Sequence, residues 1–353
     1  MGSKGESPRS DGVGFRLTRR GLLAGASAVA GAHLLGGSQG HSVSAVEGPA
    51  GFQAGAVASG HAVRGAQVQI KPPPPPPINW RPGHFITHVD VATRRMALTF
   101  DDGPSPYNTP SVLRTLASYG IKATFFLVGV NVRSFPSIAR AIAEEGHELG
   151  NHSIYHTPYQ STALANQIGG NQAIIRDTTG ITPVVHRAPG LTRGYSILNT
   201  CASYGIYEAH THMSTFDYLS PRRSAWQLTD EFVRYHRNGA MPIYHDGGNR
   251  RPTPDALPSI INYGLSIGYT FVTATELVNS GAPRPARFGY ALTAEPTTDS
   301  VADDAAEGYV DRCKYDAEAE LIAMLDSGDV SLNSQDRSRI VEVLADIETA
   351  KQD

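Results

Sequence analysis

Short apolar runs alternate with longer amphipathic segments between about residues 80 and 280. The runs have the length of buried strands and lie near 96–100, 123–128, 147–150, 184–187, 206–210, 241–245 and 270–273. The segments between them have helical spacing and include Ser111–Tyr119, Ser137–Glu145, Tyr195–Tyr204, Trp226–Arg237 and Asp255–Ile267. Strands that alternate with helices predict a parallel sheet.

Glycines stand where the chain enters the next predicted strand, at Gly120, Gly146, Gly180, Gly205, Gly239 and Gly268. Glycine is typical of this place because it adopts the left-handed conformation that ends many helices. Seven strand–helix units fit a barrel better than an open sheet. We therefore expect an α/β protein with a distorted (β/α)7 barrel over residues 79–284.

Residues 1–45 have the pattern of an export signal. Arg19 and Arg20 directly precede an apolar stretch that ends near Gly36, and Val43–Ala45 fits a small-residue cleavage site. This pattern predicts a twin-arginine signal and a protein that is secreted or associated with the cell wall. No other stretch reaches the ~18 apolar residues of a membrane span, so we expect none after signal removal.

The predicted barrel is flanked by two segments of different composition. Residues 46–78 are rich in Gly, Ala and Ser and end in the six prolines Pro72 to Pro77, which predict a linker with a stiff polyproline II part. Residues 285–353 form an acidic extension, because Ala286–Asp353 holds 16 acidic and 6 basic residues. A solvated acidic appendage without chemistry is the default interpretation of such a segment.

Helical patterns in the extension cover Tyr309–Leu325 and Gln335–Thr349, with Ser334 as the expected N-cap. They predict a small hairpin that is docked on the barrel or tethered to it. The net charge of −3 gives no reason to expect a nucleic-acid partner. Cys201 is expected to be a buried thiol, while its pairing with Cys313 and the oligomeric state stay open.

The ends of the predicted strands carry side chains suited to metal and proton-transfer chemistry. Asp101 and Asp102 follow the first strand, and His152 and His156 follow the third. In βα barrels chemistry lies at the carboxyl ends of strands, and a turn there lets adjacent side chains reach one cleft. One carboxylate can then bind a metal while the other acts as a base. Two histidines at i and i+4 can face one ion if the backbone turns helically.

A rival pattern, His147–His152, is similar to the metalloprotease HExxH. Three residues rather than two separate Glu148 from His152, and Gly150 would weaken the helix that the motif requires. We therefore reject a metalloprotease. The remaining strand histidines are expected to be structural, namely His186, His210, His212 and His236.

The ordered set of strand-end motifs resembles the polysaccharide deacetylase family, the NodB-like enzymes of carbohydrate esterase family 4. The five family motifs are matched in order by Thr99–Gly103, His152–His156, Arg187 with Pro189, Asp217-Tyr218 and Ile243–Asp246. The resemblance covers about residues 95–280 and implies a distorted barrel of the NodB type. Two departures concern the pocket: Gly190 stands where an aromatic residue is frequent, and Tyr218 where the family has tryptophan. In addition, Ser214 replaces an earlier Asp of the fourth motif.

The resemblance implies a metal centre. Asp102, His152 and His156 would bind a divalent metal, usually zinc, with cobalt or nickel as alternatives. The metal would polarise the amide carbonyl and acidify a water molecule.

The resemblance also implies the proton carriers. Asp101 would be the base, held in place by Arg187. His245 would be the acid that protonates the departing amine, oriented by Asp217.

The remaining motif residues would shape the substrate pocket. The backbone N–H of Gly190, after Pro189, would help to hold the developing oxyanion. Tyr218 and Ile243 would surround the acetyl methyl group.

The expected function is a secreted, metal-dependent deacetylase that releases acetate from N-acetylglucosamine polymers, such as peptidoglycan or chitin-like chains. A carbohydrate-binding pseudoenzyme is the alternative from another class. An O-deacetylase of xylan-like polymers or an amidohydrolase of small cyclic amides would also suit the fold.

Overall fold

The computed structural model describes residues 85–157, 164–211, 213, 215–218, 223–249, 251–285, 316–327 and 332–351. All of them belong to one of the two units of the chain, Val68–Asp353. The predicted signal at 1–45 and linker at 46–78 lie outside the described residues, as do His212, Ser214 and Cys313. None of the helices in the described ranges is both long enough and apolar enough to cross a membrane.

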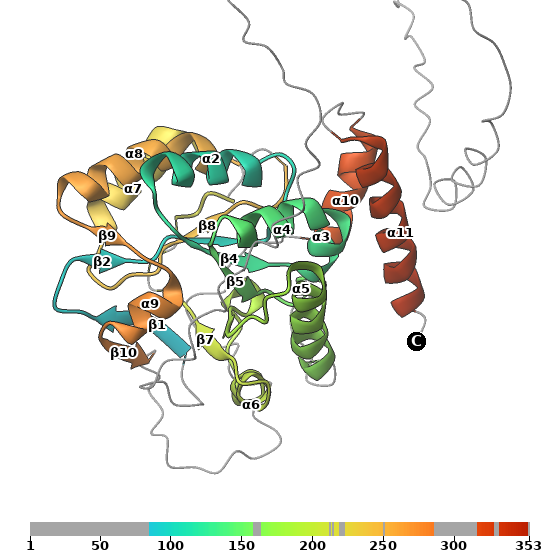
Figure 1. The fold of residues 1–353 in the computed structure, drawn as a ribbon, viewed down its shortest axis with the longest axis horizontal. Coiled ribbons are helices and arrows are strands. Elements are labelled where there is room, and N and C mark those ends of the chain that lie inside the picture. Colours follow the sequence, from blue (N-terminus) through green and yellow to red (C-terminus); the bar gives the residue numbers. More distant parts are fainter. Residues whose placement is uncertain are drawn as a thin grey trace, which may run out of the picture. The chain divides into compact units, whose positions relative to one another are not determined.

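One eight-stranded sheet forms the centre of this unit (Figure 1). Its order is β10 (Ala282–Pro285), β1 (Phe85–Asp90), β7 (Tyr207–Ala209), β6 (Val185–His186), β5 (Glu148–Asn151), β4 (Thr124–Leu127), β3 (Thr99–Asp101) and β8 (Ile243–His245). Every neighbouring pair is parallel except β10 with β1. The predicted α/β class with a parallel sheet is therefore confirmed.

The composition of the sheet differs from the prediction at two strands. The run expected near 270–273 is β9 (Thr270–Phe271), which pairs with β2 (Arg95–Met96) in a separate two-stranded sheet. The seventh parallel strand is instead β1, which the sequence analysis did not predict. Its FITHVD sequence mixes polar with apolar positions and no predicted helix precedes it, so it lacked the strand–helix signature.

The sheet is curled, and the curl brings β1 against the segment that enters β8. Val89 N–H donates to Gly239 O at 2.9 Å, and His88 forms an isolated antiparallel bridge with Ala240. Gly239 has a φ of 74°, and a Cβ there would lie 1.7 Å from Val89 O. Only glycine allows this close approach. Gly239, which the sequence predicted to end a helix, therefore forms the contact between the two sides of the sheet.

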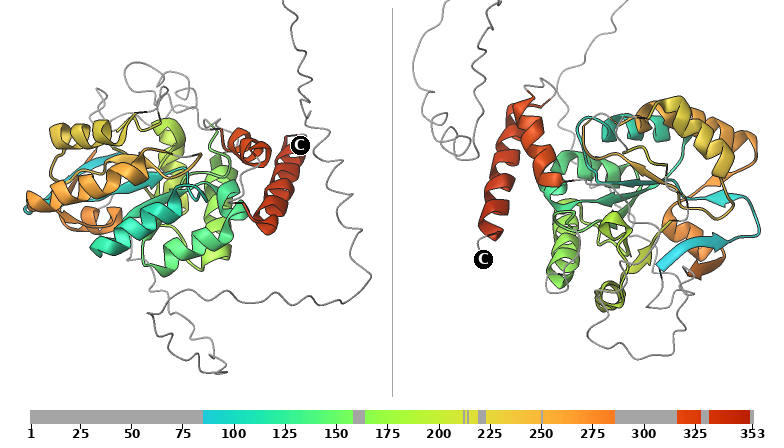
Figure 2. Two further views of the ribbon diagram at one scale, coloured as in Figure 1. Left: turned by 90° about the horizontal axis from the view of Figure 1, so that it is seen from above. Right: turned by 180° about the vertical axis from the view of Figure 1, so that it is seen from behind.

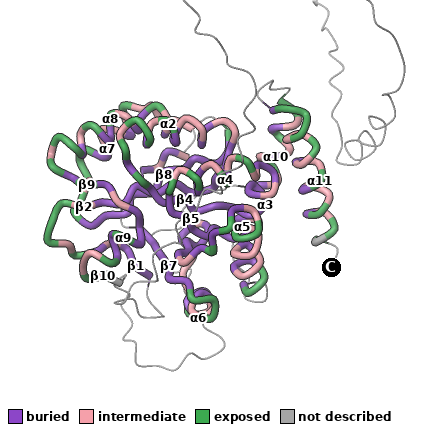
Figure 3. The backbone as a smooth tube through the Cα atoms, viewed as in Figure 1, coloured by how far each residue is buried: buried purple, intermediate pink, exposed green. Residues whose placement is uncertain are grey.

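Helices cover the sheet between its strands, and its parallel strands are almost entirely buried, whereas the edge strand β10 is not (Figure 3). The helices are α2 (Thr109–Tyr119), α3 (Gly129–Ser134), α4 (Pro136–Glu144), α5 (Asn171–Thr179), α6 (Tyr195–Ser203), α7 (Ala225–Tyr235), α8 (Thr253–Ser266) and α9 (Ala274–Asn279). Shorter turns occupy Asn166–Gly170 and Pro189–Leu191. The largest apolar core joins strand residues such as Phe100 and Phe125 to α2, α4 and α8. The five predicted helices correspond to α2, α4, α6, α7 and α8 within two residues at each end.

The acidic extension contains α10 (Ala317–Asp326) and α11 (Ser334–Ala350), which we call the C-terminal hairpin. It lies beside α3 (Figures 1 and 2). The expected N-cap of α11 is wrong by one residue: Asn333 Oδ1 accepts from Asp336 N–H at 2.8 Å. Asparagine is as good a cap as serine, so the residue type did not distinguish the two positions.

Candidate functional site

Asp101 and Asp102 reach the same cleft at the end of β3. Asp101 is the last strand residue, and Asp102 adopts a left-handed backbone with a φ of 72°. This turn redirects the second side chain, so that both carboxylates approach His152 Nε2, at 3.9 Å from Asp101 and 3.4 Å from Asp102. A continuous strand would have sent the two side chains to opposite faces.

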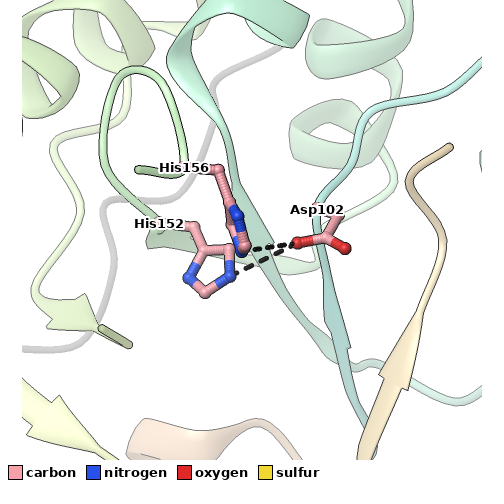
Figure 4. Close-up of side chains that lie close together, drawn as sticks. All are labelled: Asp102, His152 and His156. Carbon is pink, nitrogen blue, oxygen red and sulfur yellow. Dashed lines mark ion pairs between the residues drawn. The ribbon is translucent and has the colours of Figure 1, made fainter. Parts of the chain in front are cut away.

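Asp102, His152 and His156 form a cluster that could hold a metal ion (Figure 4). Asp102 Oδ1 lies 3.4 Å from His152 Nε2 and 3.2 Å from His156 Nε2. Two ligands about 2.0–2.1 Å from a tetrahedral zinc ion are roughly 3.3 Å apart. The observed spacing therefore suits three ligands around one cation.

Asp102 provides the test of whether these residues fit a metal. Its side chain is completely buried, yet neither carboxylate oxygen accepts a hydrogen bond. Burial raises the pKa of this carboxyl, but His156 and His152 outweigh burial and lower it below its usual range. A buried ionised carboxylate without donors is costly unless a cation pairs with it, so the donor set fits a divalent metal.

The two histidines come from a loop and not from a helical turn. Ser153 and His156 have left-handed backbones, with φ of 65° and 57°. Asn151 Oδ1 accepts from Ser153 N–H at 3.0 Å, and Ser153 Oγ accepts from His156 N–H at 3.0 Å. The i, i+4 spacing brings the rings together as expected, but through an Asx-type loop.

The backbone of Arg187 orients the first histidine. His152 Nδ1 donates to Arg187 O at 2.7 Å, which directs Nε2 toward Asp102. A hydrogen bond at the far nitrogen commonly fixes the tautomer and the ring plane of a metal-binding histidine. Burial lowers the pKa of His152, but Asp101 and Asp102 outweigh it and raise the pKa. Protons therefore compete with a cation for this ring.

Arg187 also contacts Asp101 through its side chain. The guanidinium is fully buried, lies 4.1 Å from the centre of the Phe126 ring, and donates to Asp101 Oδ1 at 2.7 Å. Arg187 Nε donates to Ala209 O at 3.0 Å. The predicted base and its predicted partner are thus brought together, with Asp101 Oδ2 left on the side of His152.

Asp217 and His245 form the second pair. His245 Nδ1 donates to Asp217 Oδ1 at 2.6 Å, and the His245 backbone N–H donates to Oδ2 at 2.8 Å. The Thr253 hydroxyl donates to the same Oδ2. Burial raises the pKa of Asp217, but His245 and Thr253 outweigh it and lower the pKa. An ionised Asp217 favours the protonated form of His245.

The predicted pocket residues lie around these pairs. The Tyr218 ring packs edge-on against His245 with centroids 5.2 Å apart. Ile243 is buried in β8, two residues before His245. Pro189 begins a short turn in which Gly190 has a φ of 61°, a conformation that explains glycine at this position.

Asp246 has a place in the site that the sequence analysis did not assign. It lies fully buried beneath the turn, where a Cβ on Gly103 would be 2.5 Å from either carboxylate oxygen. Thr109 Oγ1 donates to its Oδ2 at 2.5 Å. Burial raises the pKa of Asp246 to about 7, with the Thr109 hydrogen bond opposing and the Asp102 and Asp101 charges adding to the rise. The sequence signal for Asp246 was its position at the end of the fifth motif, directly after His245.

A second buried polar group, His186, Cys201 and Glu208, lies between the sheet and α6. Glu208 pairs with His186 Nδ1, accepts from Cys201 Sγ at 3.8 Å, and accepts from Ala188 N–H at 2.8 Å. These polar atoms satisfy one another, in contrast to Asp102. The prediction that Cys201 is buried and His186 is structural agrees with this arrangement.

The rejected HExxH pattern is also structural. His147 Nδ1 accepts from Ala123 N–H at 3.2 Å. Glu148 accepts from Thr124 Oγ1 at 2.7 Å and from the Thr275 hydroxyl. Neither belongs to the cluster of Asp102, His152 and His156.

The parallel α/β sheet brings together an Asp–His–His cluster, an Asp–Arg pair and an Asp–His pair, an arrangement that suits a hydrolase. The family model described as polysaccharide deacetylase matches residues 88–209. A peptidoglycan-N-acetylglucosamine deacetylase of Bacillus cereus is 32% identical over 202 residues, which are 56% of this chain and 93% of that protein. The chain belongs to the polysaccharide deacetylase family.

Two further similarities agree with this assignment. A peptidoglycan-N-acetylglucosamine deacetylase of Listeria monocytogenes is 34% identical over 189 residues, which are 52% of this chain and 39% of that protein. The crystal structure of a peptidoglycan N-acetylglucosamine deacetylase with 4-naphthalen-1-yl-N-oxidanyl-benzamide has a TM-score of 0.54 and 27% identity, over 59% of this chain and 99% of that one. The family predicted from the five motifs is confirmed, and with it the class of enzyme, a hydrolase of the polysaccharide deacetylase type.

Proposed function

We propose that this protein removes N-acetyl groups from N-acetylglucosamine-containing polysaccharides and releases acetate. One observation carries the proposal: Asp102, with both oxygens lacking hydrogen-bond donors, faces His152 and His156, and Asp101 lies beside them. This is the arrangement of a hydrolytic site built around a divalent cation and a base. The similar enzymes of Bacillus cereus and Listeria support peptidoglycan as the substrate class.

Asp102, His152 and His156 would hold the cation, which we propose to be zinc, with cobalt or nickel as alternatives. Mixed oxygen and imidazole ligands suit these ions. A bound cation would supply Lewis-acid chemistry to the acetyl carbonyl.

The chain's own residues would move the protons. Asp101, fixed by Arg187, would accept a proton from the attacking water. His245, paired with ionised Asp217, would donate a proton to the leaving amine nitrogen. The C–N bond breaks, acetate departs, and a free amine remains on the sugar.

The pocket residues would bind the acetyl group. The N–H of Gly190 would donate to the oxyanion that develops on the carbonyl, and Tyr218 and Ile243 would surround the methyl group. Gly190 leaves this wall more open than an aromatic side chain would. Because this wall is open, the pocket residues support the reaction, N-deacetylation, and we propose no particular length or decoration of the glycan.

Two alternatives are less well supported. A carbohydrate-binding pseudoenzyme would not need Asp101 and His245 each held by its own buried partner. O-deacetylation of xylan-like polymers depends less on a proton donor such as His245, because an alkoxide leaves more easily than an amide nitrogen. We further propose that the protein acts outside the cytoplasm, where such polysaccharides are found, after export through the 1–45 signal.

The test is acetate release from acetylated glycans by metal-loaded protein. Asp101→Asn and His245→Ala should each lower turnover by ~10²–10⁴, the usual cost of losing a positioned base or acid. Both variants should retain metal, whereas His152→Ala should lose it because one of three protein ligands is removed. Near-wild-type acetate release by either proton-carrier variant, with metal content verified, would refute the assigned roles.

A further inference from the structure

The short helix α3 contacts both parts of the chain that supply the clustered ligands. Asn131 Nδ2 donates to Asp102 O at 2.7 Å. Gly129 N–H donates to Ser153 O and Val130 N–H donates to Ile154 O, both at 3.0 Å. Ser153 and Ile154 lie in the loop between the two histidine ligands. Three hydrogen bonds from one helix therefore set the position of Asp102 relative to His152 and His156.

The other side of α3 is covered by the C-terminal hairpin. The two share an apolar cluster, in which the residues from the α3 region are Val128, Val130, Phe135 and Ile154. The hairpin residues in it are Ala317, Leu321, Met324, Leu332, Ile340, Val343 and Ile347. Arg133 of α3 also forms an ion pair with Asp346 of α11. Ile154 belongs to both sets of contacts, since it accepts the Val130 hydrogen bond and packs in this cluster.

The hairpin also comes close to the segment that follows β8. A Cβ on Gly248, in the segment after β8, would lie 3.0 Å from Arg251 Nη2 and 3.4 Å from Glu320 Oε1 of α10. Arg251 Nη2 is 4.0 Å from Asp102 Oδ2. The two helices of the hairpin thus adjoin both segments that flank the Asp102 carboxylate.

We propose that the C-terminal hairpin is a positioning element of the metal centre, and that it acts through α3 and Asn131. A six-residue helix is too short to be stable by itself, so its position depends on what packs against it. The docked hairpin keeps α3 in place. The three hydrogen bonds of α3 in turn hold Asp102, His152 and His156 at separations that suit a metal. This inference rests on the proposed metal site and on no assumption about the glycan.

The expected size of the effect follows from the role of hydrogen bonds behind metal ligands. Loss of a partner that orients a ligand typically costs 10–100-fold in metal affinity. The hairpin supports two such contacts at once, to Asp102 and to the histidine loop. Undocking it should therefore weaken metal binding at least 10-fold while the parallel sheet stays folded.

The first test compares Val343→Glu with Ser338→Glu in the full-length protein. Val343 is 3% exposed in the shared cluster, whereas Ser338 is an exposed residue of the same helix. We expect Val343→Glu to raise the dissociation constant for Zn²⁺, measured by chelator competition, at least 10-fold, and Ser338→Glu to leave it within about twofold of wild type. Hydrogen–deuterium exchange of α11 amides reports whether the hairpin has undocked.

The second test is Asn131→Ala, which leaves the hairpin side of α3 intact and removes the hydrogen bond to Asp102. It should also weaken Zn²⁺ binding about 10–100-fold. The proposal is overturned if Zn²⁺ binds both variants as tightly as wild type while exchange shows α11 released in Val343→Glu. Because the measurement needs no substrate, failure of the glycan assignment alone leaves this result unchanged. Wild-type protein that binds no Zn²⁺ would instead refute the metal site itself.

Discussion

Asp101 and Asp102 are neighbours in the chain with the same side chain, and their surroundings give them different chemistry. Asp101 receives the Arg187 guanidinium, whereas Asp102 receives no hydrogen-bond donor and faces two imidazoles. The left-handed backbone of Asp102 creates the difference. In the proposed mechanism Asp101 is the base, and Asp102 binds the cation. The difference between the two carboxylates therefore depends on the φ torsion of Asp102.

Asp246 gives a residue-scale prediction about pH. In the folded chain, burial raises the pKa of Asp246 from its ordinary value of 3.8 to about 7. Between about pH 4 and 7 the folded state therefore keeps a proton that the unfolded state has released, so stability falls as pH rises through this range. The Asp246→Asn variant has no ionisable side chain at this position. Without metal, its free energy of unfolding should therefore rise relative to that of wild type as the pH rises from 5 to 8.

One pKa unit corresponds to about 1.4 kcal/mol, so the gain should amount to a few kcal/mol. Urea unfolding of chelator-treated protein at the two pH values measures it. Asp255→Asn, which changes an exposed carboxylate in α8, is the control and should show no such gain. An Asp246→Asn stability difference that does not change between pH 5 and pH 8 would contradict the shifted pKa.

At the scale of elements, the junction between β1 and β8 gives a prediction with an internal control. Gly239 and Gly268 both have positive φ, at 74° and 84°. A Cβ on Gly239 would meet Val89 O at 1.7 Å, whereas a Cβ on Gly268 would meet nothing within 4 Å. Gly268→Ala should cost only the left-handed backbone, roughly 1–2 kcal/mol.

Gly239→Ala should cost clearly more than Gly268→Ala, because the β1 backbone must also move away. The free energies of unfolding of the two variants, measured in denaturant, separate the cost of backbone strain from the cost of the close approach to Val89. Equal losses in the two variants would show that the contact between β1 and the segment entering β8 does not constrain the sheet.

The sequence predicted most of the repeating elements and the candidate site residues that lie together, but it did not predict the contacts that support them. Periodicity located the strands that carry Asp101, His152 and His245, because buried parallel strands are continuous apolar runs. It missed β1, whose pattern is mixed, and α3, which is too short for a helical period. Periodicity also gives no sign of Asn131, because its side chain donates a hydrogen bond to a backbone oxygen 29 positions away.

At the scale of the whole molecule, the acidic extension is more closely integrated than its composition indicates. Charge counting predicted a solvated appendage, yet α10 and α11 bury six apolar side chains in the cluster with α3, and Leu332 between them adds a seventh. The sequence contained this information in part, since the spacing of Ile340 and Ile347 puts them on one face of a helix. It could not show which surface that face would cover, because partner choice depends on tertiary packing.

The export signal gives a prediction for the complete chain. Arg19→Lys with Arg20→Lys should keep the precursor in the cytoplasm, because a twin-arginine signal is defined by that pair. Cell fractionation and immunoblotting of the full-length protein measure this. Wild-type amounts of the double variant outside the membrane would refute the twin-arginine assignment, whatever the enzyme does there.

The docking of the hairpin on α3 also bears on the order in which the protein is made. The three candidate ligands lie between Asp102 and His156, whereas Val343 and Ile347 of the hairpin come much later in the chain. Domains generally fold during synthesis from the N-terminal side, but here the support for α3 is synthesised well after the ligands. If the hairpin positions the ligands as proposed, a nascent chain has no finished cation site to fill. Tight metal binding would then follow synthesis of the hairpin, and a translation product that stops before α10 would bind the metal more weakly.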